Sequence, residues 1–148
     1  MSAVPSTRQA TSQFAARFSA PVVARLRAHA DRSGRSQKQL AERYIDEGMR
    51  MDDHPGIVFR DGPMGRRAGL AAGPDAWEIV GALKSLPTRG AAAVGQLAEL
   101  LELSEGQIQT ALDYYGEFTD EVEKLIRRNE EEAARAEAAW RRQQAALG

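Results

Sequence analysis

The chain has 148 residues, of which 43% are hydrophobic and 28% are charged, and its formal net charge is −1. This composition is typical of a globular chain with one ordinary domain or two small ones. Cysteine is absent, which excludes disulfides and thiolate chemistry, and the two histidines, His29 and His54, have no ligand spacing around them. We therefore expect a protein that is not an enzyme and that needs no cofactor or metal.

The sequence has no run of about 18 apolar residues, so no membrane span is predicted. The N-terminal residues MSAVPSTRQATSQ also lack the apolar core of a signal peptide. We expect a cytoplasmic protein without a membrane partner.

Charge is divided unevenly along the chain. Residues 1–51 contain nine Arg or Lys and four Asp or Glu, whereas residues 52–148 contain 11 basic and 17 acidic side chains. The basic first third favours a polyanionic partner, and the acidic remainder favours a partner of another kind.

The first predicted elements are an arm and a strand. Residues 1–11 are small and polar and are predicted to be a disordered arm. Phe14, Ala16 and Phe18 then alternate with other residues, a period that predicts a strand over residues 13–18 with these three side chains on one face.

Two helices are predicted after this strand. Ser19 is the expected N-cap of the first, which has Pro21 in its first turn and ends at Gly34. Ser36 and Gln39 form a capping box at the start of the second. The expected buried face of the second helix consists of Leu40, Ala41, Tyr44, Ile45 and Met49.

A single strand followed by two helices is an incomplete fold, because the strand's backbone donors and acceptors lack partners. Two copies can pair their strands antiparallel about a twofold axis, and such a ribbon fits the major groove of DNA. Gln13, Ala15 and Arg17 then face outward, where arginine can read guanine and glutamine can read adenine. The alternative is a half-buried strand in an ordinary α+β domain.

Residues 12–51 resemble the ribbon-helix-helix module of CopG/Arc-type repressors and of antitoxins of the VapB kind. The resemblance implies a homodimer whose base-reading face is Gln13, Ala15 and Arg17. It also implies that the start of the second helix clamps a DNA phosphate through Arg35, Ser36, Gln37 and Lys38. Ala15 replaces the usual polar residue, so base reading rests on two side chains per copy.

The rest of the chain is predicted as a hairpin followed by helices. Residues 52–74 are rich in glycine and proline and predict a hairpin over residues 56–59 and about 66–70. Capping boxes at Asp75–Glu78 and Ser104–Gln107 open two helices, with a further helix over about 92–102 between them. Gly116 is expected to end the helix that Ser104 opens. Thr119 is expected to start a last helix that runs to about residue 146.

Residues 94–115 have the layout of a helix-turn-helix. The exposed face of its second helix offers Glu105, Gln107, Gln109 and Asp113, and no Arg or Lys occurs from residue 90 to 123. A surface without cations favours contact with protein over contact with a second DNA site.

The stretch from about His54 to Glu131 resembles a small winged-helix family, known mainly as a domain of unknown function, that occurs in antitoxins paired with PIN-like toxins. The resemblance rests on the hairpin that ends in Gly65-Arg66-Arg67, on the helix-turn-helix, and on the run from Ala111 to Tyr115. Arg66 and Arg67 would contact DNA as a wing; the alternative is a solvated turn.

The last predicted helix has an apolar side. It consists of Val122, Leu125, Ile126, Ala133, Ala136 and Trp140. One interpretation is packing within the chain or in a coiled coil, and the other is docking in a partner's groove with Trp140 as anchor. From residue 117 onward acids outnumber bases eight to six, which would complement a basic site that cleaves nucleic acid.

The sequence thus predicts a mainly α protein: a ribbon-helix-helix domain at 12–51, a winged-helix-like domain at 52–118 with a β-hairpin and a helix-turn-helix, and a long toxin-binding helix at 119–148. The resemblances imply the antitoxin of a type II toxin–antitoxin system, which binds operator DNA as a dimer and neutralises a PIN-domain ribonuclease toxin. The alternative is a stand-alone ribbon-helix-helix regulator with a C-terminal oligomerisation or sensing domain.

Overall fold

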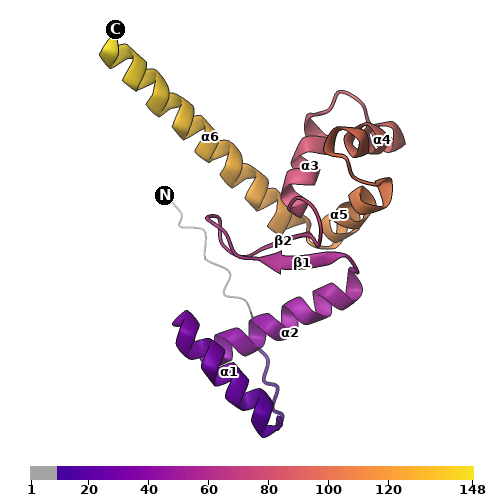
Figure 1. Ribbon diagram of the computed structural model, residues 1–148, viewed down its shortest axis with the longest axis vertical. Helices are drawn as coiled ribbons and strands as arrows, with labels where there is room; N and C mark the ends of the chain where they lie inside the picture. The colour runs from indigo at the N-terminus through magenta and orange to yellow at the C-terminus, as the bar shows by residue number, and fades with distance from the viewer. Residues whose placement is uncertain (1–9) are drawn as a thin grey trace. The chain divides into compact units, whose positions relative to one another are not determined.

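A computed structural model describes residues 10–148 (Figure 1), so most of the predicted arm at 1–11 lies outside the described residues. The described part is mainly helical and has one small antiparallel sheet. Its elements are α1 (Ala20–Ser33), α2 (Gln37–Asp53), β1 (Ile57–Arg60), β2 (Arg67–Leu70), α3 (Ala76–Ser85), α4 (Gly90–Leu101), α5 (Glu105–Glu117) and α6 (Thr119–Leu147). None of these helices is long and apolar enough to cross a membrane.

The chain divides into two compact units, and the boundary falls between Tyr44 and Ile45. This point lies inside α2, before the predicted domain limit at residue 51. The second half of α2 belongs to the second unit because its polar side chains pair with residues that follow it in the chain, as Glu47 does with Arg66.

The first unit contains α1 and the first half of α2. α1 follows Ser19 and ends at Gly34, whose φ of 66° is left-handed and favours glycine, and whose N–H donates to the carbonyl of Ala30. At the start of α2, the N–H of Gln39 donates to Ser36 Oγ at 3.0 Å, and the N–H of Ser36 donates to Gln39 Oε1 at 3.3 Å. The predicted limits of α1, the predicted start of α2 and its capping box are confirmed, although the Ser19 side chain makes no capping hydrogen bond.

The predicted strand at 13–18 is absent from the single chain. Residues 10–19 have no regular secondary structure, and all of them are exposed. A strand exists only by pairing, and the sheet of the described residues contains β1 and β2 alone. Residues 10–148 of one copy therefore offer this segment no strand to pair with.

In the second unit the predicted hairpin follows α2, and its first strand is shifted by one residue. β1 and β2 pair antiparallel from Ile57 opposite Leu70 to Arg60 opposite Arg67. The connecting turn is closed by two hydrogen bonds between the backbones of Gly62 and Gly65.

Helices α3 and α5 pack on this hairpin, α4 packs on α3 and α5, and the start of α6 completes the core. The predicted capping boxes of α3 and α5 are both present, with Asp75–Glu78 and Ser104–Gln107 as partners. α5 continues through Gly116 to Glu117, so the predicted stop at that glycine is wrong; the break comes at Phe118, whose φ and ψ leave the helical range. The buried core consists of Ile57, Ala68, Leu70, Ala76, Ile79, Val80, Leu97, Ala98, Ile108, Ala111, Tyr114, Val122 and Ile126.

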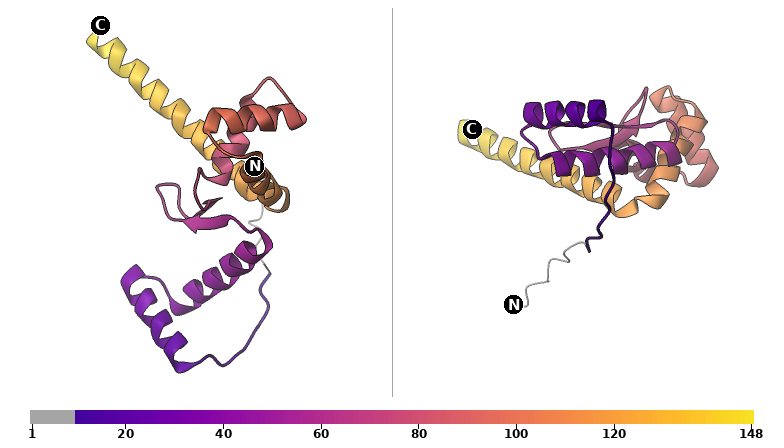
Figure 2. Two further views of the ribbon diagram at one scale, coloured as in Figure 1. Left: turned by 45° about the vertical axis from the view of Figure 1, so that its right-hand side comes forward. Right: turned by 90° about the horizontal axis from the view of Figure 1, so that it is seen from below.

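α6 has 29 residues and is about 43 Å long at 1.5 Å per residue. Only its first turns pack on the core, through Val122 and Ile126. Figures 1 and 2 show its C-terminal part extending well past α3 and α5, and from Arg127 onward nearly every residue is exposed.

Candidate functional site

The predicted base-reading residues lie in the segment before α1. Gln13, Ala15 and Arg17 are exposed, as expected. The two phenylalanines of the same segment were expected to face inward, but in the single chain Phe14 is 80% exposed and Phe18 is 58% exposed. Large aromatic side chains in water lose the stabilisation that burial gives them, so this segment is not in its most favourable environment as a single copy.

The predicted phosphate clamp lies at the start of α2. Arg35, Ser36, Gln37 and Lys38 are all exposed, and the first turn of α2 contains no acidic residue. The N-terminus of a 17-residue helix carries a partial positive charge and free backbone N–H groups. Together with the side chains of Arg35 and Lys38, this end of α2 has the chemistry that binds a phosphate.

The predicted buried face of α2 is only partly buried. Leu40 is fully buried, whereas Tyr44, Ile45 and Met49 are exposed. Val22 of α1 is exposed as well. In the single chain the predicted burial is therefore not found for Tyr44, Ile45 and Met49, and no apolar element of residues 10–148 covers them.

The helix-turn-helix of the second unit presents an acidic surface. Glu105, Gln109 and Asp113 of α5 are exposed, and the Gln109 amide donates to Asp113 Oδ1 at 2.9 Å. Gln107 is partly buried and is used in the capping box. An acidic surface repels the phosphates of DNA.

The two arginines of the predicted wing are bound within the unit. Arg66 donates to both oxygens of buried Glu47, with Nη2–Oε1 at 2.7 Å and Nε–Oε2 at 2.9 Å, and hydrogen bonding to this carboxylate raises the pKa of Arg66. Arg67 donates to buried Asp75, which also accepts from Arg60 Nη2 at 2.9 Å. The turn is largely exposed, as the second alternative expected, but both arginines are also paired with buried carboxylates.

The sequence did not reveal a polar cluster around Arg50. Arg50 Nη1 donates to the hydroxyl of Tyr114 and to Glu121 Oε1, both at 2.9 Å, and its guanidinium lies 3.9 Å from the centre of the Phe118 ring. Burial alone would lower the pKa of Arg50, but these hydrogen bonds outweigh it and raise the pKa. Burial, and then the bond to Glu121, raise the pKa of Tyr114. The cluster ties the end of α2 to α5 and α6.

His54 extends the same connection. Its Nε2 lies 2.6 Å from Glu117 Oε2, and its ring lies edge-on to that of Tyr114 at 5.4 Å. No short sequence motif predicts these pairings, because the paired residues are more than 60 positions apart in the chain. Their arrangement is that of a structural clamp on α2.

The predicted partner-binding face of α6 divides into two parts. Val122 and Ile126 are buried in the core of the second unit and Leu125 is partly buried, so the expectation of a docking surface is wrong for Val122 and Ile126. Ala133 is exposed, and Trp140 is 58% exposed. Of the predicted docking face on α6, only the C-terminal part with Ala133 and Trp140 is therefore exposed for a partner.

Comparisons with protein-family models, with curated proteins and with solved structures found no match. The function is inferred from the residues themselves.

Proposed function

We propose that this chain is the antitoxin of a type II toxin–antitoxin pair. Residues 12–51 of two copies form a ribbon-helix-helix dimer on operator DNA. The winged-helix-like second unit and α6 bind and neutralise a PIN-domain ribonuclease. The proposal rests above all on the exposure of Phe14 and Phe18, in front of two helices whose apolar faces are also exposed.

Pairing of residues 13–18 between two copies accounts for these exposed groups. Two antiparallel strands satisfy each other's backbone groups, and the alternation then directs Phe14 and Phe18 inward, against the apolar faces of α1 and α2. Gln13 and Arg17 remain on the outer face of the ribbon, which enters the major groove. The phosphate-binding chemistry at the start of α2 flanks this face in a ribbon-helix-helix dimer.

The second unit suits a protein partner better than DNA. Its α5 surface is acidic, and both hairpin arginines are used to neutralise Glu47 and Asp75. The exposed part of α6 offers Trp140, which follows two alanines and precedes Arg141 and Arg142, and buried tryptophans often dominate protein interfaces. The exposed acids in the middle of α6, Glu130, Glu131 and Glu132, would complement the basic site expected in a ribonuclease.

Truncation of α6 tests this assignment. A chain that ends after Arg128 keeps Val122 and Ile126 in the core but lacks Trp140, whereas a cut at Thr119 would remove part of the core. We expect the truncated chain to fold and to bind operator DNA like the full chain. It should fail to rescue cells that express the toxin encoded by the neighbouring gene, and full rescue would refute docking through α6.

Single substitutions refine the test. Trp140→Ala should weaken toxin binding about thirtyfold or more, since a buried tryptophan anchor contributes about 2 kcal/mol or more. Gln144→Ala, on the exposed end of the same helix, is the matched control and should bind like wild type.

The second candidate is a stand-alone ribbon-helix-helix regulator whose C-terminal part serves oligomerisation or sensing. The exposed apolar side chains of Trp140 and Leu147 on α6 favour this alternative, because they would also fit pairing of this helix between two copies. The two candidates differ in their genomic neighbour, because an antitoxin needs an adjacent toxin gene and a regulator does not.

A further inference from the structure

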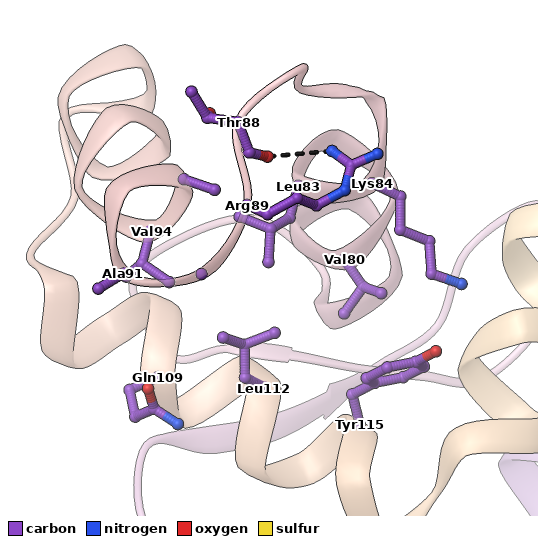
Figure 3. A pocket seen from close by; sticks show the side chains of 12 residues that line it. Val80, Leu83, Lys84, Thr88, Arg89, Ala91, Val94, Gln109, Leu112 and Tyr115 are labelled. Carbon is purple, nitrogen blue, oxygen red and sulfur yellow. Dashed lines mark hydrogen bonds between the residues drawn. The ribbon is translucent and has the colours of Figure 1, made fainter.

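The second unit contains a cavity of about 500 Å³ that none of the assignments above uses. It lies between α3, α4 and α5, next to the segment that joins α3 to α4. Figure 3 shows Val80 and Leu83 on one side, Leu112 and Tyr115 opposite them, and Val94 at one end. The volume is in the range of pockets that hold small molecules.

The walls of the cavity are largely apolar. Val80 is buried, and Leu83, Val94 and Leu112 pack partly against the core, with their remaining surface turned to the cavity. An apolar ligand body in this space would remove such surface from water, at about 25 cal/mol for each Å² buried.

Two cations lie at the edge of the cavity, and only one of them has an anionic partner. Lys84 donates to Glu123, which also accepts from the hydroxyl of Tyr115, so the Lys84 charge is compensated. Arg89 Nη1 donates to the backbone carbonyls of Leu86 and Thr88, the latter at 3.0 Å (Figure 3). Within residues 10–148, no carboxylate pairs with Arg89, and its Nε and Nη2 have no hydrogen-bond partner.

The two backbone carbonyls hold the guanidinium in place, which reduces the entropy lost when it binds an anion. A guanidinium presents parallel N–H groups that match the two oxygens of a carboxylate. A phosphate dianion would bring two negative charges to one uncompensated cation beside apolar walls, which is less favourable. The charges therefore select a monoanion.

We propose that this cavity binds a small amphipathic carboxylate, with an apolar body among Val80, Leu83 and Leu112 and its carboxylate on Arg89. The site is independent of the DNA and toxin contacts proposed above. A bound molecule would contact α3, α4 and α5 at once and so stabilise the second unit against unfolding.

Phenylbutyrate is a suitable probe of this cavity because it joins an apolar ring to a carboxylate. Phenylbutyramide, which has nearly the same shape but no charge, is the control ligand. With the full-length protein, we expect phenylbutyrate to raise the unfolding temperature and to shift the amide NMR signals of Leu83, Val94 and Leu112. The amide should bind at least tenfold more weakly. Phenyl phosphate should also bind more weakly, and tighter binding by it would overturn the choice of a carboxylate.

Two variants locate the site. Arg89→Gln should weaken phenylbutyrate binding at least tenfold and leave amide binding unchanged, whereas Arg142→Gln, on the exposed end of α6, should have no effect. Ala91→Phe, at an exposed position on the cavity wall, should block both ligands without disturbing the core. Circular dichroism checks that each variant folds.

Equal binding of acid and amide, or wild-type affinity in Arg89→Gln, would overturn the proposal. NMR shifts of the cavity residues that depend on protein concentration in the absence of ligand would also overturn it, since they would assign the cavity to a side chain of a second copy.

Discussion

The two units of this chain differ in how completely each buries its own apolar residues. Within residues 10–44 only Ala30 and Leu40 are buried, and the two phenylalanines are in water. The second unit has a continuous core in which Ile79, Ile108 and Tyr114 have no exposed surface. A short pair of helices encloses too little volume for a core, which is why we propose that the first unit pairs with a second copy.

The units also differ in how they use positive charge. In the second unit Arg60, Arg66 and Arg67 neutralise buried carboxylates. In the first unit Arg17 and Lys38 are exposed. The three arginines of the second unit therefore stabilise its fold, whereas Arg17 and Lys38 of the first unit are available to contact a polyanion.

The largest expected effect is on the first unit. Phe18→Asp places a charge at the proposed seam between two copies, and burying an unpaired carboxylate is prohibitive. We expect loss of the dimer in sedimentation experiments and complete loss of operator binding, with the unfolding of the second unit unchanged. Phe18→Leu is the control and should remain dimeric. A wild-type protein that is a stable monomer in light scattering would contradict the proposed dimer.

The next effect is confined to the second unit. Asp75→Asn keeps a capping group for α3 but leaves Arg60 and Arg67 without their anion, which should cost about 3–5 kcal/mol of unfolding free energy. Asp61→Asn removes an exposed carboxylate 3.4 Å from Arg66 and should cost about 1 kcal/mol or less. Denaturant titrations measure the unfolding free energy of both variants. Equal losses of unfolding free energy would show that the ion pairs of Asp75 do not stabilise the second unit more than an exposed pair does.

Smaller changes are expected in DNA affinity. Arg17→Ala should weaken operator binding by about 1–3 kcal/mol per contact and relax its sequence preference, as loss of a guanine contact does. Lys38→Ala should weaken binding to all sequences alike and reduce the salt slope by about 1. Gel shifts at several salt concentrations measure both effects. If neither variant differs from wild type while Arg66→Ala abolishes binding, the DNA site lies in the second unit.

The smallest expected effect concerns the pH dependence of stability. Hydrogen bonds from Lys84 and then Tyr115 lower the pKa of Glu123 below its usual value. A carboxylate with a depressed pKa in the folded state stabilises the fold above its unfolded pKa, and this contribution is lost as the pH falls through the folded pKa. Unfolding midpoints of Lys84→Met should therefore fall less steeply in acid than those of wild type; parallel curves would show that the pair contributes nothing.

The sequence by itself determined the local elements of this protein. The capping boxes of α2, α3 and α5 each join residues three positions apart, and the hairpin joins neighbouring segments, so their limits follow from short-range hydrogen bonds. Helical period also identified the apolar side of α6. The same helical period is found whether the apolar residues pack on the core of their own chain or on another protein. Only the tertiary structure showed that Val122 and Ile126 lie in the core and that Trp140 is exposed.

The tertiary structure alone decided which charges are paired and where space remains. Arg66 meets Glu47 across 19 positions, and Arg50 meets Glu121 across 71, separations at which no local pattern specifies a partner. The cavity beside Arg89 exists because three helices pack without filling the space between them. The predicted strand at 13–18 is not formed in the described residues, because a strand's hydrogen bonds require a neighbouring strand to pair with.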